Sequence, residues 1–144
     1  MLQALEFQVT FPSSYVLLER YAKLVGADDE VFCFARYLIE LALVDVKMNK
    51  WSPSRVASAG IFLAKKILKR SNPWCRTLTR NTNYREREVR ECARDLCIIL
   101  NVATRHKNKH YESLFKKFST SRFYRVAEIP VYLRQKALEE QARN

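Results

Sequence analysis

The 144-residue chain contains only two glycines and four prolines, so it has little of the turn chemistry that a multi-stranded sheet requires. It also lacks a run of apolar residues long enough to cross a bilayer. Its first residues do not form a secretory signal, which would need a basic segment followed by an apolar one. These absences argue against a β architecture and a membrane partner, and we expect a helical protein of the cell interior.

The shortage of glycine also excludes common nucleotide-binding motifs. With Gly26 and Gly60 alone, neither a phosphate-binding loop nor a dinucleotide fingerprint can be formed, and we expect no cofactor. The two histidines, His106 and His110, lie in a charged stretch without a nearby carboxylate or thiol at motif spacing. Solvated surface histidines explain this pattern better than a catalytic base does. We therefore predict no enzyme activity, and a binding or scaffold role follows by elimination.

Four cysteines could form disulfides or a metal site. A chain of this size with 48% hydrophobic residues buries a core that needs no disulfide, so we expect reduced thiols. Cys92, Cys97, His106 and His110 have the spacing C-x4-C-x8-H-x3-H. Residues five apart on a helix point about 140° away from each other, and the spacer is shorter than in the usual zinc finger. We expect no metal.

The most informative segment, residues 52–64, predicts a helix at the centre of the domain. Ser52 can cap its first turn, and Pro53 suits the first helical position because the amide there has no intrahelical partner. The small residues that follow allow other helices to approach from several directions: Ala57, Ser58, Ala59, Gly60 and Ala64. This pattern is typical of a helix that is surrounded by others.

Apolar periodicity predicts the helices around this central one. Leu2, Leu5 and Phe7 have helical spacing with nothing ahead of them to cap a helix, so we expect residues 1–11 to be the end of a preceding element or a linker. We expect one domain over residues 12–129 and a polar tail over 130–144 that frays from Arg134 onward. We expect a first helix that ends near Gly26, then helical segments over about 28–42, 52–70, 74–79 and 84–103. A further short helix is expected to end near 118.

The net charge is +11, and two segments of the chain are strongly basic. The first, residues 46–85, contains no acidic residue, and the second, residues 104–125, contains Glu112 as its only acid. Such surfaces attract an acidic or phosphorylated partner or nucleic acid, although a solvated basic face is the simpler explanation. Between Val46 and Arg85 there is no Asp or Glu but there are Lys47, Lys50, Arg55, Lys65, Lys66, Lys69, Arg70, Arg76, Arg80 and Arg85.

Several short segments follow one another in a fixed order along about residues 2–129. They are L-E-F-Q-V at 5–9 with P-S at 12–13, A-R-Y-L-I-E-L at 35–41 with Asp45, P-S-R-V-A at 53–57 with L-A at 63–64, Trp74, Tyr84 with Val89 and Cys92, and K-F-S-T-S-R-F at 117–123 with V-A at 126–127. In this order and spacing, they resemble the second (C-terminal) cyclin box of A- and B-type cyclins. Arg85, Val89 and Phe118 depart from the family pattern and indicate a divergent member.

The resemblance implies an all-α, cyclin-like five-helix domain with a central buried helix. It also implies a regulatory subunit of a cyclin-dependent Ser/Thr protein kinase, acting by protein binding in cell-cycle control in the nucleus and cytoplasm. In the family, the residues that grip the kinase and the patch that docks substrates belong to the first cyclin box, which would precede Leu2. The kinase is therefore expected to bind mainly through a part outside this chain.

Two further interpretations concern the positive charge. A basic helical nucleic-acid-binding module is the alternative function, since a transcription factor that bridges promoter and polymerase uses related helical repeats on DNA. Against it, basic and aromatic residues are not interleaved on a predicted recognition helix. Alternatively, a cluster at the end of the central helix forms a site for a phosphorylated or acidic protein. The residues predicted for that site are Lys65, Lys66, Lys69 and Arg70.

Overall fold

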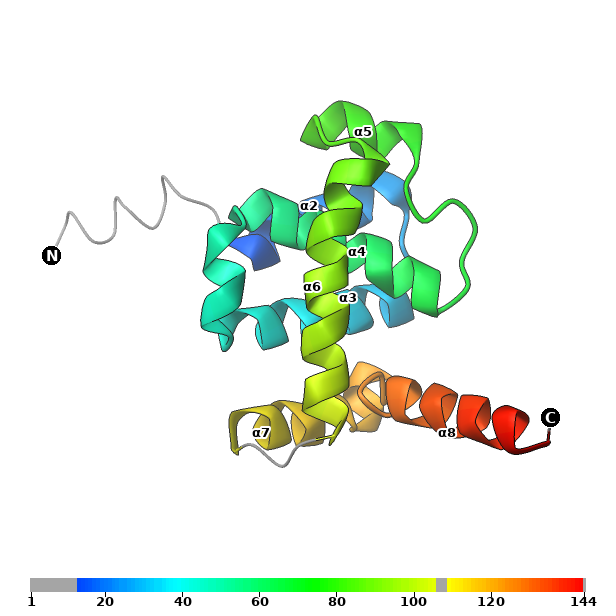
Figure 1. Ribbon diagram of the computed structural model, residues 1–144. Helices are drawn as coiled ribbons and strands as arrows, with labels where there is room; N and C mark the ends of the chain where they lie inside the picture. Colours follow the sequence, from blue (N-terminus) through cyan, green and yellow to red (C-terminus); the bar gives the residue numbers. More distant parts are fainter. Residues whose placement is uncertain (1–12, 106–108, 144) are drawn as a thin grey trace, which may run out of the picture.

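The computed structural model describes residues 13–105 and 109–143, so the predicted linker at 1–11 lies outside the described residues. Helices form all of the regular structure within those two ranges, which confirms the all-α prediction (Figure 1). The elements are α2 (Ser14–Val25), α3 (Asp29–Leu43), the 3-10 helix η1 (Val46–Lys50), α4 (Pro53–Ile67), α5 (Arg76–Thr82), α6 (Glu86–Arg105), α7 (Lys109–Phe118), the 3-10 helix η2 (Ser121–Phe123) and α8 (Glu128–Arg143).

Helix α4 is the predicted central helix, and its position is confirmed. Every residue from Val56 to Ala64 is buried, and α4 packs against α2, α3, α5 and α6. At Gly60 an added Cβ would lie 3.3 Å from Cγ1 of Ile39 and 3.5 Å from the carbonyl oxygen of Ala35. The absence of a side chain at Gly60 therefore allows α3 to lie directly against α4.

Side-chain and backbone caps define where the inner helices begin and end. The Ser13 hydroxyl accepts a hydrogen bond from the Val16 amide at 3.4 Å, and the Ser52 hydroxyl accepts one from the Arg55 amide at 3.3 Å. Gly26 ends α2 with a φ of 61°, a left-handed conformation that glycine adopts without strain. Asp29 and Glu30 lie in the first turn of α3, where negative charge stabilises the helix dipole.

Helix α6 runs across α4 and reaches α7 below it, while α7 and η2 close the underside of α3 (Figure 1). Three aromatic rings make that closure. The ring centroids of Tyr37 and Phe118 are 5.2 Å apart, and those of Phe118 and Phe123 are 4.8 Å apart. Tyr37 and Phe118 are fully buried, so residues from the last third of the chain complete the core that α3 begins.

The C-terminal segment differs from the prediction of a frayed tail, because α8 continues to Arg143. Pro130 lies in its first turn, where proline is tolerated, and the residues that follow are mostly strong helix formers. Its side chains from Lys136 onward are exposed, so backbone propensity rather than burial explains this part of the helix. No helix in the described ranges is long and apolar enough to span a membrane.

Candidate functional site

The residues considered for metal binding do not come together in the described structure. Cys92 is buried in the core, and burial raises the pKa of its thiol to about 12. Cys97 is half-buried, one helical turn and a half further along α6. His106 lies outside the described residues, as does the side chain of His110. Among the residues that can be described, no three His, Cys, Asp or Glu side chains are placed to hold a metal ion.

Two of the four cations predicted to form a binding site serve internal contacts. Lys65 donates a hydrogen bond from Nζ to the carbonyl oxygen of Asn72 at 3.0 Å. Arg70 lies against the start of α3, where its Nη2 is 2.8 Å from Oδ2 of Asp28 and 3.3 Å from Oε1 of Glu30. The hydrogen bond and charge of Asp28, with the charge of Glu30, raise the pKa of Arg70. Arg70 therefore ties the end of α4 to α3.

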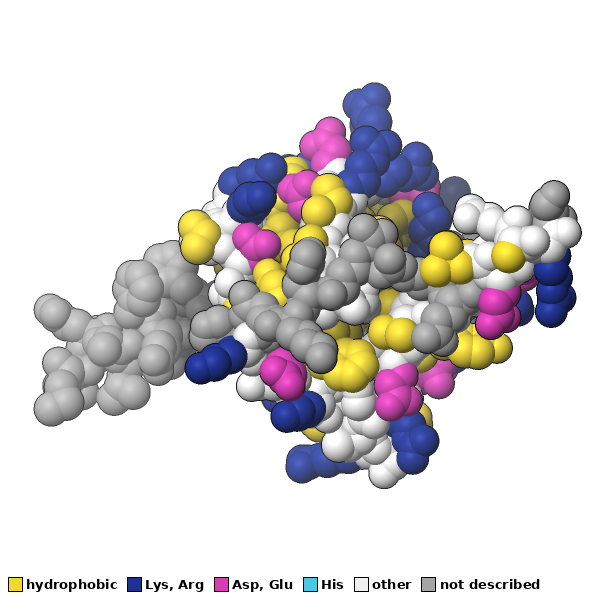
Figure 2. Space-filling view, turned by 60° about the horizontal axis from the view of Figure 1, so that its bottom comes forward, with side chains coloured by type: hydrophobic (Ala, Val, Ile, Leu, Met, Phe, Trp, Pro, Cys, Tyr) yellow, Lys and Arg dark blue, Asp and Glu magenta, His cyan; other side chains and the backbone are white. Residues whose placement is uncertain are grey.

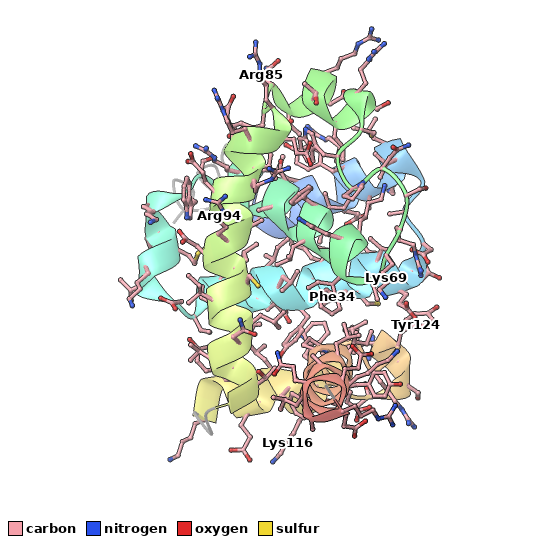
Figure 3. All side chains as sticks on the ribbon, turned by 45° about the vertical axis from the view of Figure 1, so that its right-hand side comes forward. Phe34, Lys69, Arg85, Arg94, Lys116 and Tyr124 are labelled. Atoms are coloured by element: carbon pink, nitrogen blue, oxygen red, sulfur yellow. The ribbon has the colours of Figure 1, made fainter. Side chains whose placement is uncertain are left out.

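The other two cations are exposed but point to different surroundings. Lys69 lies beyond the end of α4 with a φ of 57°, in the left-handed region (Figure 3). Lys66 lies on the last turn of α4, with its Nζ 5.7 Å from the centroid of the Phe62 ring. Of the four predicted residues, Lys65 and Arg70 are therefore engaged in internal contacts, and Lys66 lines a cavity together with residues of α6.

That cavity, which we call the basic groove, has a volume of about 540 Å³ and lies between α4 and α6. Its cations stand on both helices, with Lys66 on α4 and Arg90 and Arg94 on α6. Figure 3 shows Arg94 on α6 at the level of α4. Its remaining lining is apolar: Phe62, Leu63, Ile67, Ala93 and Cys97.

A separate network at the other end of α4 fixes α4 against α6. Arg55 donates from Nε and Nη2 to the carbonyl oxygen of Glu88, at 3.2 and 2.8 Å. The guanidinium of Arg55 also lies 4.7 Å from the ring centroid of Trp51, whose Nε1 donates to Oδ2 of Asp95 at 2.9 Å. Lys50 pairs with the same carboxylate at 3.2 Å. These contacts hold the two helices that form the walls of the basic groove.

Sequence reasoning assigned Arg90 and Arg94 only to the outer face of α6 and did not connect them with Lys66. Arg90 and Arg94 are four residues apart and therefore lie on the same side of α6, which the sequence alone could have indicated. The pairing of that side with the last turn of α4 could not be read from spacing, because it depends on how the two helices cross. Positive charge is also widely distributed, and Lys and Arg side chains surround the face that carries α7 and α8 (Figure 2).

Comparison with known proteins gives consistent matches. A family model described as "Cyclin, C-terminal domain" matches residues 11–132. The chain is 32% identical over 132 residues to "G2/mitotic-specific cyclin-B" of Dictyostelium discoideum, a match that covers 91% of this chain and 30% of that protein. It is 32% identical over 128 residues to "Cyclin-B2-1" of Arabidopsis thaliana, covering 89% and 29% respectively. The chain thus spans less than a third of the length of these relatives.

Proposed function

Because the chain belongs to the cyclin C-terminal domain family, we propose that it is the C-terminal cyclin box of a regulatory subunit of a cyclin-dependent Ser/Thr protein kinase. It acts by protein binding in cell-cycle control, has no active site of its own, and works in the nucleus and cytoplasm. The match to the family over residues 11–132 carries this proposal. The central position of α4, with its small buried residues, supports it independently.

The relatives also suggest the kind of cyclin. Two B-type cyclins, from an amoeba and a plant, match about nine tenths of this chain at 32% identity. The name of the first relative assigns it to G2 and mitosis. We therefore propose a mitotic cyclin whose kinase contacts lie mainly in a first cyclin box, while this domain completes the subunit and offers a surface to other proteins.

The test uses the complete reading frame from which the chain comes. It is co-expressed with cyclin-dependent kinases of the same organism, purified through the kinase, and assayed for phosphorylation of a peptide that contains Ser and Thr. We expect co-purification with at least one kinase and phosphorylation well above that of the kinase alone. A complete protein that binds none of these kinases and stimulates none would contradict the proposal.

A further inference from the structure

We infer that the basic groove binds a protein segment in which Asp or Glu residues flank an apolar side chain. This inference goes beyond the proposed kinase role and does not depend on it, because it rests on the chemistry of the groove alone. The groove has two features that a single ligand must satisfy together. One is its apolar floor, and the other is a set of cations that stand around that floor.

The floor of the groove is apolar and well packed. Phe62, Leu63 and Ala93 are 2%, 7% and 4% exposed, so they form a packed base, and the half-buried Ile67 and Cys97 add accessible apolar surface to the lining. The Phe62 ring is itself fixed by an edge contact with Trp74, at a centroid distance of 6.5 Å. A cavity of about 540 Å³ is large enough to accept an apolar side chain of a partner.

Two of the three cations around the floor, Lys66 and Arg94, are available to a ligand. No carboxylate in the described ranges forms an ion pair with Lys66 or Arg94. Arg90 pairs with Glu86 at 3.1 Å, one turn away on the same helix, so we assign the contacts with the ligand to Lys66 and Arg94. Guanidinium groups bind carboxylates through paired hydrogen bonds, and a partner with Asp or Glu residues would meet Lys66 and Arg94 on opposite walls.

The combination favours an acidic protein segment over other anions. Duplex DNA and free phosphate would satisfy the cations but would leave the apolar floor without a partner. A second copy of the chain carries a net charge of +11 and is repelled at long range. An acidic segment with one apolar residue among its carboxylates complements both features, since its charge is opposite and its side chain fits the floor.

The walls of the groove are also fixed before a ligand arrives. The hydrogen bonds from Arg55 in the first turn of α4 to the Glu88 carbonyl, and from Trp51 just before α4 to Asp95, join this part of the chain to α6. A preformed groove loses little conformational entropy when it binds, so a short segment can be held with useful affinity.

The test begins with the chain itself as bait in a phage display selection from random peptides. Enriched peptides are then synthesised with a fluorescein label and titrated by fluorescence polarisation. We expect the enriched sequences to place Asp or Glu on both sides of an apolar residue, and to bind more weakly as salt rises. Enrichment of peptides without acidic residues, or of none at all, would overturn the inference.

A charge-reversal variant localises the binding. We expect the double substitution Lys66→Glu and Arg94→Glu to weaken the peptides at least about tenfold, because two attractive contacts become repulsive. The double substitution Lys47→Glu and Lys109→Glu is the matched control, because it changes the net charge by the same amount. Lys47 is exposed on η1, which precedes the opposite end of α4, and Lys109 is exposed at the start of α7, so this variant should keep its affinity within about twofold. Equal losses in the two proteins would mean that only the net charge matters and would refute the site.

A second pair of variants tests the floor without changing charge. Cys97→Tyr should fill the groove and abolish binding, whereas Cys97→Ala should preserve it, and circular dichroism checks that both remain folded. Unchanged binding by folded Cys97→Tyr would place the ligand elsewhere. Kinase co-purification by the complete protein carrying Lys66→Glu and Arg94→Glu should be unaffected, so that failure of the groove and failure of the kinase proposal are seen separately.

Discussion

At Gly60 the backbones of α3 and α4 are in contact, and a larger residue there must separate them. We expect Gly60→Val to lower the free energy of unfolding by about 2–3 kcal/mol, because its branched side chain would enter the space of Ile39 and the Ala35 carbonyl. Urea unfolding followed by circular dichroism measures the change.

Gly60→Ala is the control for this substitution. Its single methyl group needs only a small shift of Ile39, which is 3.3 Å away, and alanine gains up to about 1 kcal/mol of helix propensity over glycine. We expect Gly60→Ala to remain within about 1 kcal/mol of the original protein. A Val variant as stable as the Ala variant would show that α3 and α4 are not held as closely as the structure indicates.

Tyr37 makes a second prediction, which concerns pH. Its hydroxyl is buried without a hydrogen-bond partner in the described structure, and burial raises its pKa from 10.0 to about 12. Between these two values the unfolded chain loses the proton and the folded chain keeps it, so stability falls as pH rises through this window. The loss attributable to Tyr37 is about 1.4 kcal/mol per pH unit.

Tyr37→Phe should remove this part of the alkaline loss and should leave stability at neutral pH equal or higher by up to about 1 kcal/mol, because no hydrogen bond is lost. Urea midpoints measured for both proteins at about pH 8 and about pH 11 give the comparison. Cys92 contributes a similar fall above pH 9 in both, since its thiol pKa is also raised to about 12. Parallel falls in the two proteins would argue against a buried, isolated Tyr37 hydroxyl.

Single residues also show what the sequence can and cannot reveal. The burial of Gly60 and Cys92 followed from periodicity and size, and both lie in the core. The partner of Arg70 could not be predicted, because Asp28 is 42 positions earlier and only the packing of α3 against α4 brings the two together. Spacing rules capture contacts within a helix, whereas contacts between helices depend on their crossing.

At the level of elements, the start of α4 depends on its cap. The Ser52 hydroxyl accepts a hydrogen bond from the Arg55 amide and lies 3.1 Å from the Tyr84 hydroxyl. We expect Ser52→Ala to cost about 1 kcal/mol of stability, while Ser52→Asp, which keeps an acceptor at the cap, should cost much less. Thermal unfolding of the original protein and the two variants measures these differences in stability. Equal losses of stability in Ser52→Ala and Ser52→Asp would show that the hydrogen bond at the cap is unimportant.

The outer helices illustrate the limit of sequence analysis at this scale. Both ends of α2 and the start of α4 were predictable because Ser13, Gly26, Ser52 and Pro53 give strong local signals, whereas α4 ends at Ile67, short of the expected residue 70. The extent of α8 was not predictable from polarity, because polar residues are common both in frayed ends and in exposed helices, and those of α8 are good helix formers. The basic groove was also beyond prediction, since it exists only where α4 and α6 meet.

For the whole molecule, the charge of +11 invites a direct test of the nucleic-acid alternative. Several cations are already paired with acids, including Lys50 with Asp95, Arg70 with Asp28 and Lys117 with Glu40. We therefore expect duplex DNA to bind only weakly, with a Kd above about 1 µM at physiological salt, in a titration at two salt concentrations. Tight, steeply salt-dependent binding would instead favour a nucleic-acid function.

The contact between the last third of the chain and α3 has a consequence for biosynthesis. Lys117 reaches Glu40 across 77 positions, and Phe118 packs on Tyr37 beside it. While a ribosome is still translating residues before Phe118, the underside of α3 lacks the cover that α7 and η2 provide, and Tyr37 remains without the Phe118 ring that packs on it. The core of this domain therefore cannot close until Phe118 has been synthesised, and until then the nascent chain exposes apolar surface that favours aggregation.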